Sequence, residues 1–391
     1  MENILSYARQ SISEDDIEEV VKVLKSNCIT QGPKLKEFEE EIAKKVNSKY
    51  TVAVNSATSA LHIACLSLNL KPGDCVWTSS ISFVASANCA LYCGAKVDFV
   101  DIDIETALMS IEHLESKLIE AEKNGTLPKV VIPVHLGGTS CNMQAISKLS
   151  KKYEFKIIED ASHAIGGKYQ DSYVGSCEYS DITIFSFHPV KIITTAEGGM
   201  ALTNNEDLAK KMEKLRGHGI VRNGFIEESP GQWYYEQQDL GYNYRMNEIE
   251  AALGLSQLKR LDYFVKRRNE LVRYYKEHLT KLDNLELLME PSNTYSSYHL
   301  AVVRLINSTS EDHKNLFNWM RSKNVWVQLH YWPIHLQLYY KKLIGEINYL
   351  PNSEKYGVSC FSIPLHPELK DYEQEYVINR LNEGMKMLKT G

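Results

Sequence analysis

The chain has 391 residues, 43% of them hydrophobic and 24% charged, which is the composition of a globular protein long enough for two domains. Its 44 basic and 50 acidic residues give a formal net charge of −6, which argues against nucleic acid as the main partner. The eight cysteines form no C-x-x-C pair, so we expect reduced thiols and a cytoplasmic location.

No membrane partner is expected. The first ten residues lack the apolar run of a signal peptide. Two uncharged stretches, at 50–70 and 75–95, contain serine, threonine and asparagine side chains that a bilayer would leave without hydrogen-bond partners. These stretches are better explained as buried helices and strands.

The first half of the chain alternates between strand and helix patterns. After two amphipathic helices, at 14–24 and 34–46, we predict strands at 51–54, 75–79, 96–100, 129–135 and 155–160. Helical patterns follow the first four of them at 56–68, 82–93, 111–121 and 143–153. This order is typical of an α/β layer with a mostly parallel sheet, which binds ligands at the carboxyl ends of its strands.

The pattern changes after two further strands, at 181–187 and 199–204. One long helical segment is predicted at 248–279, followed by strands near 299–305, 325–330 and 361–365 and helices near 312–322 and 372–388. We therefore expect a large domain over residues 1–265 and a smaller α+β domain over residues 266–391.

Several common cofactor motifs are missing. The sequence has no G-x-G-x-x-G after a strand, no G-x-x-x-x-G-K-[ST] and no H-E-x-x-H, and its histidines lack the usual zinc spacing. A Rossmann dehydrogenase, a P-loop nucleotidase and a metal site are thus disfavoured.

Two strand ends carry candidate ligand-binding residues. Asn55, Ser56, Ala57 and Thr58 stand where a strand turns into a helix, so they predict either an anion site or a simple N-cap. Asp160 ends an apolar strand and is suited to pair with a protonated ring nitrogen of a cofactor, although capping of the next turn is the commoner role for one such residue.

Two later segments add a lysine and an arginine. Lys191 follows a buried strand, and apart from Lys191 itself His188 is the only titratable residue from 182 to 196. Burial would lower the pKa of Lys191 and suit it to a Schiff-base role, although a surface lysine on a loop is the commoner role for one such residue. Asn243 and Arg245 precede a long helix, where anion contact competes with capping and a surface position.

The order of these features is that of a pyridoxal-phosphate enzyme of aminotransferase fold: a phosphate-binding turn, then an aspartate at a strand end, then a lysine after a strand. The chain resembles the sugar-nucleotide aminotransferases of the DegT/DnrJ/EryC1/StrS family over nearly its whole length, through TQGPKLKEFEEEIA, NSATSALHIA, EDASHAIGG, FSFHPVKIITTAEGGM and LGYNYRMNEIEAALGLSQLKRL. This resemblance implies the type I, aspartate aminotransferase-like fold, with helices on both faces of the sheet.

The resemblance also implies roles for individual residues. Lys191 would be the catalytic lysine that attaches to pyridoxal 5'-phosphate and moves the proton, whereas dehydratase relatives have histidine there. Cofactor contacts would come from Ser56, Ala57, Thr58, Phe83, Asp160, His163, Ser186 and, across a homodimer with shared active sites, Asn243. The sugar-nucleotide pocket would be lined by Tyr7, Asn27, Cys28, Ile29, Thr30, Arg245, Gln328, Leu329, His330 and Tyr331.

The implied reaction is transfer of an amino group from L-glutamate to a nucleotide sugar. The segments ITTAEGG and VQLHYWPIHLQ resemble family members of pseudaminic acid biosynthesis, whose acceptor is UDP-2-acetamido-2,6-dideoxy-β-L-arabino-hexos-4-ulose. Two alternatives remain open at this point: a different nucleotide-linked 4-keto sugar, and a non-catalytic regulatory protein on the same scaffold.

Overall fold

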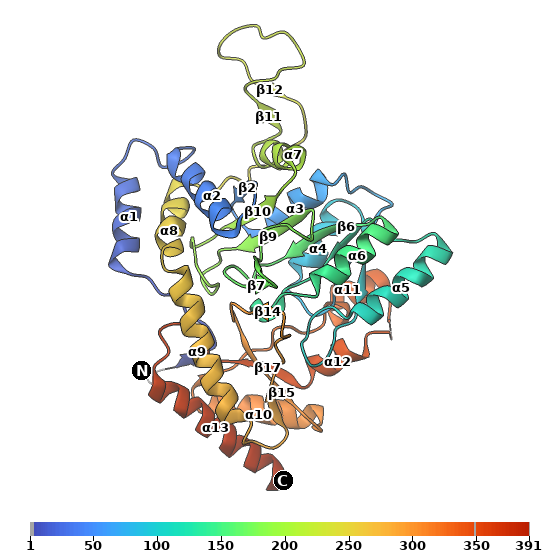
Figure 1. The fold of residues 1–391 in the computed structure, drawn as a ribbon, viewed down its shortest axis with the longest axis vertical. Coiled ribbons are helices and arrows are strands. Elements are labelled where there is room, and N and C mark those ends of the chain that lie inside the picture. Colours follow the sequence, from blue (N-terminus) through green and yellow to red (C-terminus); the bar gives the residue numbers. More distant parts are fainter. Residues whose placement is uncertain (1–3, 348, 391) are drawn as a thin grey trace.

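The computed structural model describes residues 4–347 and 349–390. Figure 1 shows a large body around a central sheet, a smaller body beside both termini, and an arm that projects from the large body past α7 (Glu206–Arg216). The arm comprises residues 218–241 and carries the short pair β11 (Ile220–Val221) and β12 (Glu236–Gln237).

A seven-stranded sheet forms the centre of the large body. Its strands lie in the order β2 (Tyr50–Val54), β10 (Gly199–Thr203), β9 (Ile182–Ser186), β6 (Lys156–Asp160), β5 (Val130–Ile132), β3 (Cys75–Ser79) and β4 (Lys96–Val100). β10 runs antiparallel to both neighbours, and all other pairs are parallel. The predicted mostly parallel sheet is confirmed, and its nearly continuous apolar strands are those of a sheet covered on both faces.

Helices cover both faces of the sheet. Successive residues of a strand point to opposite faces, so each face carries apolar side chains that a helix can cover. Val52 and Val54 pack with α3 (Ala57–Ser67) and α4 (Ala85–Tyr92), whereas Ala53 between them packs with α2 (Pro33–Val46). Three further helices complete the second face: α5 (Ile111–Asn124), α6 (Met143–Tyr153) and α8 (Glu248–Leu258).

The single helix predicted at 248–279 is wrong, because the segment forms two helices. α8 ends at Leu258, and α9 (Leu261–Leu279) starts after Arg260. The Arg260 side chain reaches the N-terminal segment, where it donates to the Ser11 carbonyl at 2.9 Å and pairs with Asp16 of α1 (Glu14–Leu24). The interruption between α8 and α9 therefore coincides with a tertiary contact to the N-terminal segment.

The smaller body has its own core around a three-stranded antiparallel sheet. β15 (Ala301–Leu305) lies between β13 (Leu285–Leu287) and β17 (Cys360–Ile363), with α10 (Ser310–Ser322) and α13 (Asp371–Thr390) packed against them. α9 places Phe264 and Val265 in the core of the large body and Leu271 and Tyr275 in that of the smaller one. A boundary between residues 265 and 266 stays our proposal, and α9 is the element that would bridge it.

The remaining elements are short. Only Val325–Trp326 of the strand predicted at 325–330 is a strand, β16, and it pairs with β1 (Leu5–Ser6). The others are η1 (Leu136–Gly138), β7 (Lys168–Tyr169), β8 (Ser172–Tyr173), β14 (Thr294–Tyr295), η2 (Ile334–Leu336), α11 (Leu338–Ile344) and α12 (Pro351–Gly357).

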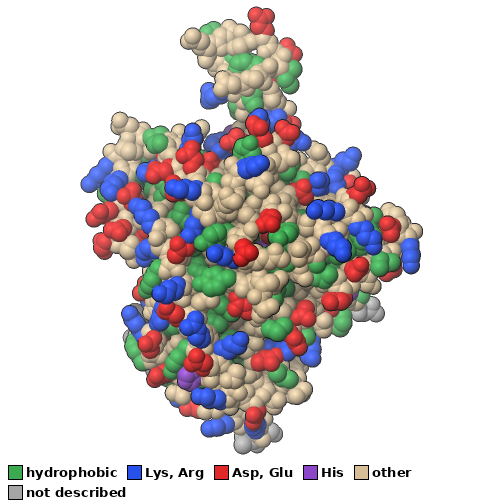
Figure 2. Space-filling view, viewed as in Figure 1, with side chains coloured by type: hydrophobic (Ala, Val, Ile, Leu, Met, Phe, Trp, Pro, Cys, Tyr) green, Lys and Arg blue, Asp and Glu red, His purple; other side chains and the backbone are tan. Residues whose placement is uncertain are grey.

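Charges of both signs are interspersed over the face shown in Figure 2, without a large field of one sign. In the part of the chain that the structure describes, no helix is both long enough and apolar enough to cross a membrane.

Candidate active site

A cavity of about 530 Å³ opens at the carboxyl ends of the central strands, where an α/β sheet binds ligands. It brings together residues that are far apart in the sequence, from the N-terminal segment before α1 to the segment after β16. Most of the residues that the sequence predicts for the site line it: Tyr7, Ser56, Ala57, Thr58, Phe83, Asp160, His163, Ser186, Lys191, Gln328, Leu329, His330 and Tyr331.

The N-terminus of α3 forms one end of the cavity. Ser56 is the N-cap, and its hydroxyl accepts a hydrogen bond from the Ser59 N–H at 3.1 Å. The N–H groups of Ala57 and Thr58, in the first turn, have no intrahelical acceptors, so they are available to an anion in the cavity. The N-cap and the anion site, which the sequence left as alternatives, are thus compatible.

Gly199 sets how closely the neighbouring strand approaches this turn. A Cβ atom on Gly199 would lie 2.4 Å from the backbone nitrogen of Ala57 and 2.4 Å from the carbonyl carbon of Ser56. Both contacts are with backbone, which cannot move aside without shifting the turn. Glycine at this position therefore allows β10 to lie against the start of α3.

Asp160 ends β6 on the cavity side and is 5% exposed. The Ser86 hydroxyl donates to Oδ2 at 2.5 Å, and the Ser162 hydroxyl and N–H donate to Oδ1 at 2.6 and 3.2 Å. The carboxylate caps the next turn, as the alternative interpretation expected, while it also lines the cavity. Sequence reasoning missed both serines.

Lys191 follows β9 on a turn in which its N–H donates to the His188 carbonyl at 2.9 Å. Burial lowers the pKa of Lys191 to about 8, and the attraction of Asp160 opposes this shift only in part. Its ammonium group has no hydrogen bond or ion pair within the described residues. A buried amine with a lowered pKa and no protein partner is suited to act as a nucleophile and as a proton carrier.

A group of uncharged histidines lies beside Lys191. The rings of His163 and His299 have centroids 4.4 Å apart, and burial, with the nearby Lys191 charge, holds both pKa values well below the usual range. Burial and Lys191 also lower the pKa of His330 to about 3. Sequence reasoning missed His299, because nothing near it in the chain indicates that it packs on His163.

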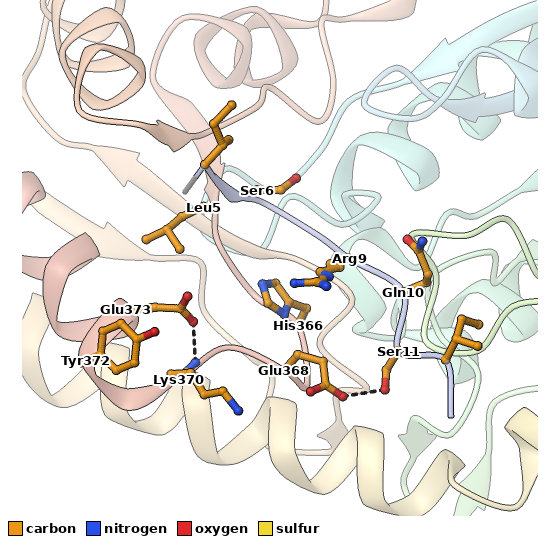
Figure 3. A pocket seen from close by; sticks show the side chains of 12 residues that line it. Leu5, Ser6, Arg9, Gln10, Ser11, His366, Glu368, Lys370, Tyr372 and Glu373 are labelled. Atoms are coloured by element: carbon orange, nitrogen blue, oxygen red, sulfur yellow. Dashed lines mark hydrogen bonds between the residues drawn. The ribbon is translucent and has the colours of Figure 1, made fainter. Parts of the chain in front are cut away.

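The N-terminal segment separates this cavity from a second one. Tyr7 lines the first cavity and packs its ring 4.6 Å from that of His330. Arg9, Ser11 and His366 line the second, a hollow of about 370 Å³ beside the start of α13 (Figure 3). There the Ser11 hydroxyl donates to Glu368 at 2.6 Å.

Six predicted site residues do not line the first cavity. The Glu248 N–H donates to the Ile29 carbonyl at 3.1 Å, and this contact holds the loop that contains Asn27, Cys28, Ile29 and Thr30 against α8. Asn243 forms a β-bridge with Gly217, and Arg245 forms one with Val54. The structure of one chain therefore gathers the expected cofactor residues except Asn243, but not the whole expected substrate set.

Comparison with known proteins points to one family. The sequence profile of the DegT/DnrJ/EryC1/StrS aminotransferase family matches residues 10–382. The chain is 37% identical over 388 residues to the UDP-4-amino-4,6-dideoxy-N-acetyl-beta-L-altrosamine transaminase of Campylobacter jejuni, and the match covers 99% of each chain.

Solved structures agree in fold. Helicobacter pylori PseC, an aminotransferase involved in the biosynthesis of pseudaminic acid, matches with a TM-score of 0.90 and 30% identity over 98% of this chain and all of that one. The putative sugar aminotransferase Spr1654 of Streptococcus pneumoniae, solved in a PMP-form, matches with a TM-score of 0.91 and 29% identity over 99% of this chain and all of that one. It is also known in a PLP-form. The predicted aminotransferase fold is confirmed.

Proposed function

The chain belongs to the DegT/DnrJ/EryC1/StrS aminotransferase family, as its sequence predicts, and on this basis we propose that it transfers an amino group from L-glutamate to a UDP-linked 4-keto-6-deoxy-N-acetylhexosamine. The observation that carries the proposal is that Lys191, Asp160 and the N-terminus of α3 all line the same cavity. Aminotransferase chemistry needs an amine, a partner for the ring nitrogen and a phosphate site, and this cavity has a candidate for each.

The residues of the cavity fit pyridoxal phosphate. Lys191 presents an amine that has no partner among the residues the structure describes, the α3 N-terminus presents free N–H groups, and Asp160 presents a carboxylate oriented by Ser86 and Ser162. When bound, pyridoxal phosphate supplies an electron sink for the carbon atom that gains or loses a proton. We assign Ser56, Ala57, Thr58 and Ser186 to the phosphate, Phe83 to the ring face and Asp160 to the ring nitrogen.

Lys191 is proposed as the group that holds and moves the proton. With a pKa of about 8, its amine exists in both protonation states near neutral pH, which is the condition for efficient general acid–base catalysis. The neighbouring His163, His299 and His330 are neutral, so they leave Lys191 as the cation among these four side chains. Asp160 is the carboxylate that balances it.

A homodimer with shared active sites is part of the proposal. Asn243, Arg245 and the loop at 27–30 lie outside their own chain's cavity, so a second copy is needed for them to reach a ligand. Large apolar side chains are exposed near these elements, on α1 and the 27–30 loop (Ile17, Leu24, Ile29) and on the arm (Ile226, Trp233, Leu240). Such exposure is typical of a surface that another protein covers.

We propose that the reaction takes place in the cytoplasm. All eight cysteines are free thiols, and seven of them, all except Cys28, are partly or fully enclosed in the cores. Reduced cysteines are the rule in compartments that keep thiols reduced.

The test is a direct assay with product analysis. Purified protein, pyridoxal phosphate and L-glutamate are incubated with UDP-2-acetamido-2,6-dideoxy-β-L-arabino-hexos-4-ulose, and NMR identifies the product. We expect a UDP-linked 4-amino sugar, which should be missing when glutamate is omitted. Glutamate turnover with no product from this sugar, but with an amine from another nucleotide-linked 4-keto sugar, would contradict the assigned substrate. Failure with every 4-keto sugar tested would contradict the proposed function.

A further inference from the structure

His163 is held as a neutral ring whose proton is on Nε2. The N–H of Gly137 donates a hydrogen bond to His163 Nδ1 at 3.2 Å, and a ring nitrogen that accepts a hydrogen bond carries no proton. The side chain is 5% exposed, and burial beside Lys191 holds the pKa of His163 well below its usual range. A neutral imidazole without a proton on Nδ1 has it on Nε2.

The direction of the next hydrogen bond follows from this tautomer. The Tyr331 hydroxyl lies 3.3 Å from His163 Nε2. Since Nε2 carries the proton, His163 donates and the tyrosine oxygen accepts. The tyrosine's own proton then needs a different acceptor, and none is found among the described residues. Burial, with Tyr7 and Asp160 nearby, raises the pKa of Tyr331, so its hydroxyl stays protonated.

We propose that Tyr331 donates a hydrogen bond to an oxygen of the ligand in the cavity, and that His163 is a positioning residue that acts through Tyr331. This inference rests on the proposed function and differs from the sequence-based expectation, in which His163 itself contacts the cofactor. The ligand atom must be a hydrogen-bond acceptor, and both the cofactor's 3-oxygen and an oxygen of the sugar nucleotide meet this requirement.

The surroundings of His163 support a fixed donor. The titratable groups that face it are Lys191, His299, His330 and Tyr331. Lys191 can only donate when charged, and within the described part of the chain no hydrogen bond links His163 to the ring of His299 or His330. Tyr331 is thus the partner of the Nε2 proton, and the centroid of its ring lies 6.0 Å from that of the Phe83 ring.

The first experiment reads the tautomer without any ligand. Apoprotein labelled with ¹⁵N at histidine is titrated by NMR from pH 5 to 9, and the His163 signals are assigned by their loss in His163→Gln. His313→Gln, which removes a half-buried histidine of α10, serves as the matched control for the assignment. We expect a protonated Nε2 and an unprotonated Nδ1 throughout. A proton on Nδ1, or a charged ring at pH 7, would overturn the inference.

The second experiment measures binding to Tyr331→Phe, His163→Gln and the double variant. We expect Tyr331→Phe to weaken binding of pyridoxal phosphate or of the UDP-sugar by about tenfold, the effect of one lost hydrogen bond to a ligand. Weaker binding of pyridoxal phosphate identifies its ring oxygen as the acceptor of the hydrogen bond. Weaker binding of the UDP-sugar alone identifies an oxygen of the substrate as the acceptor. His163→Gln should change binding less than twofold once Tyr331 is absent, because residues that act through one another are not additive. Tyr339→Phe, on the exposed side of α11, is the matched control.

Unchanged binding of both ligands by Tyr331→Phe, or full additivity of the two substitutions, would overturn the inference. The proposed function is judged separately, because it fails when the unsubstituted protein does not bind or convert any UDP-sugar. Even then, the NMR titration still tests the tautomer of His163, and the affinity for pyridoxal phosphate still tests the hydrogen bond from Tyr331.

Discussion

Glu159 and Asp160 are consecutive carboxylates at the end of β6, and each is 5% exposed. Glu159 faces the protein interior, where His135 at 2.7 Å, Thr183 at 3.0 Å and Ser180 fill its acceptor positions. Asp160 faces the cavity, where Ser86 and Ser162 orient it. Burial therefore does not distinguish a structural from a functional carboxylate, and what distinguishes them is whether the space opposite is filled by protein.

The largest expected effect is that of Lys191→Ala, which tests whether the cavity side of β6 is the reactive side. Removal of the amine should lower kcat at least about a thousandfold, since the group serves as both nucleophile and proton carrier. The measurement is turnover with saturating cofactor, with Lys156→Ala, an exposed lysine at the start of β6, as control. Retained turnover with a folded variant would mean that the assigned lysine is wrong.

Asp160→Asn should come next. The amide keeps the shape, and its oxygen can still accept from Ser162 while its NH₂ group can donate to the Ser86 oxygen, but it lacks the charge that would hold a ring nitrogen protonated. We expect kcat to fall by about 10²–10³, as is typical when a preorganised electrostatic partner is removed. The melting temperature should change little, which circular dichroism can check. A large loss of stability with normal kcat would reverse the roles of the two carboxylates.

Glu159→Gln should show the opposite pattern. Loss of a charge-assisted buried hydrogen bond to His135 should lower the free energy of unfolding by about 1–3 kcal/mol, with kcat nearly unchanged. Burial raises the pKa of Glu159, but the hydrogen bonds from His135, Ser180 and Thr183 outweigh it and lower the pKa. The stabilisation is therefore present above the usual glutamate pKa and is lost as the pH falls below about 4. Urea unfolding at pH 7 and pH 4 measures the difference, which should shrink at the lower pH.

The pH dependence of cofactor uptake sharpens the assignment of Lys191. Burial lowers the pKa of its amine to about 8, so the reactive unprotonated form grows as the pH rises through this value. The rate at which apoprotein takes up pyridoxal phosphate, followed by absorbance, should rise with a midpoint near pH 8. A midpoint near 10, the value of an exposed lysine, would contradict the burial of this amine.

Ser56→Ala should have the smallest effect. It removes the N-cap of α3, which costs about 1 kcal/mol of stability, and one hydroxyl near the proposed phosphate site. We expect cofactor affinity to fall about tenfold while kcat at saturating cofactor stays close to normal. Ser110→Ala, which removes the equivalent cap of α5 away from the cavity, should cost similar stability and leave cofactor affinity unchanged.

The sequence predicts those parts of the site that depend on local context. Lys191 and Asp160 each follow an apolar strand, and parallel strands end at one edge of a sheet, so their meeting could be expected. Ser86 could not, because it lies 74 residues before the carboxylate to which it donates. The break before α9 likewise accompanies the contact between Arg260 and Asp16, 244 residues apart. Asn243, Arg245 and the 27–30 loop lie outside the cavity of their own chain, so their contact with a ligand stays a prediction that depends on the proposed homodimer.

The tight approach of β10 to the start of α3 has a consequence for how this chain can vary. Every amino acid except glycine has a Cβ atom, so each of the nineteen alternatives at position 199 would push the turn at Ser56 and Ala57 out of place. A saturation library selected for cofactor retention should therefore return a single codon family at this position. Gly125, which ends α5 and would meet nothing within 4 Å, should accept several residues, with those that tolerate a left-handed backbone favoured.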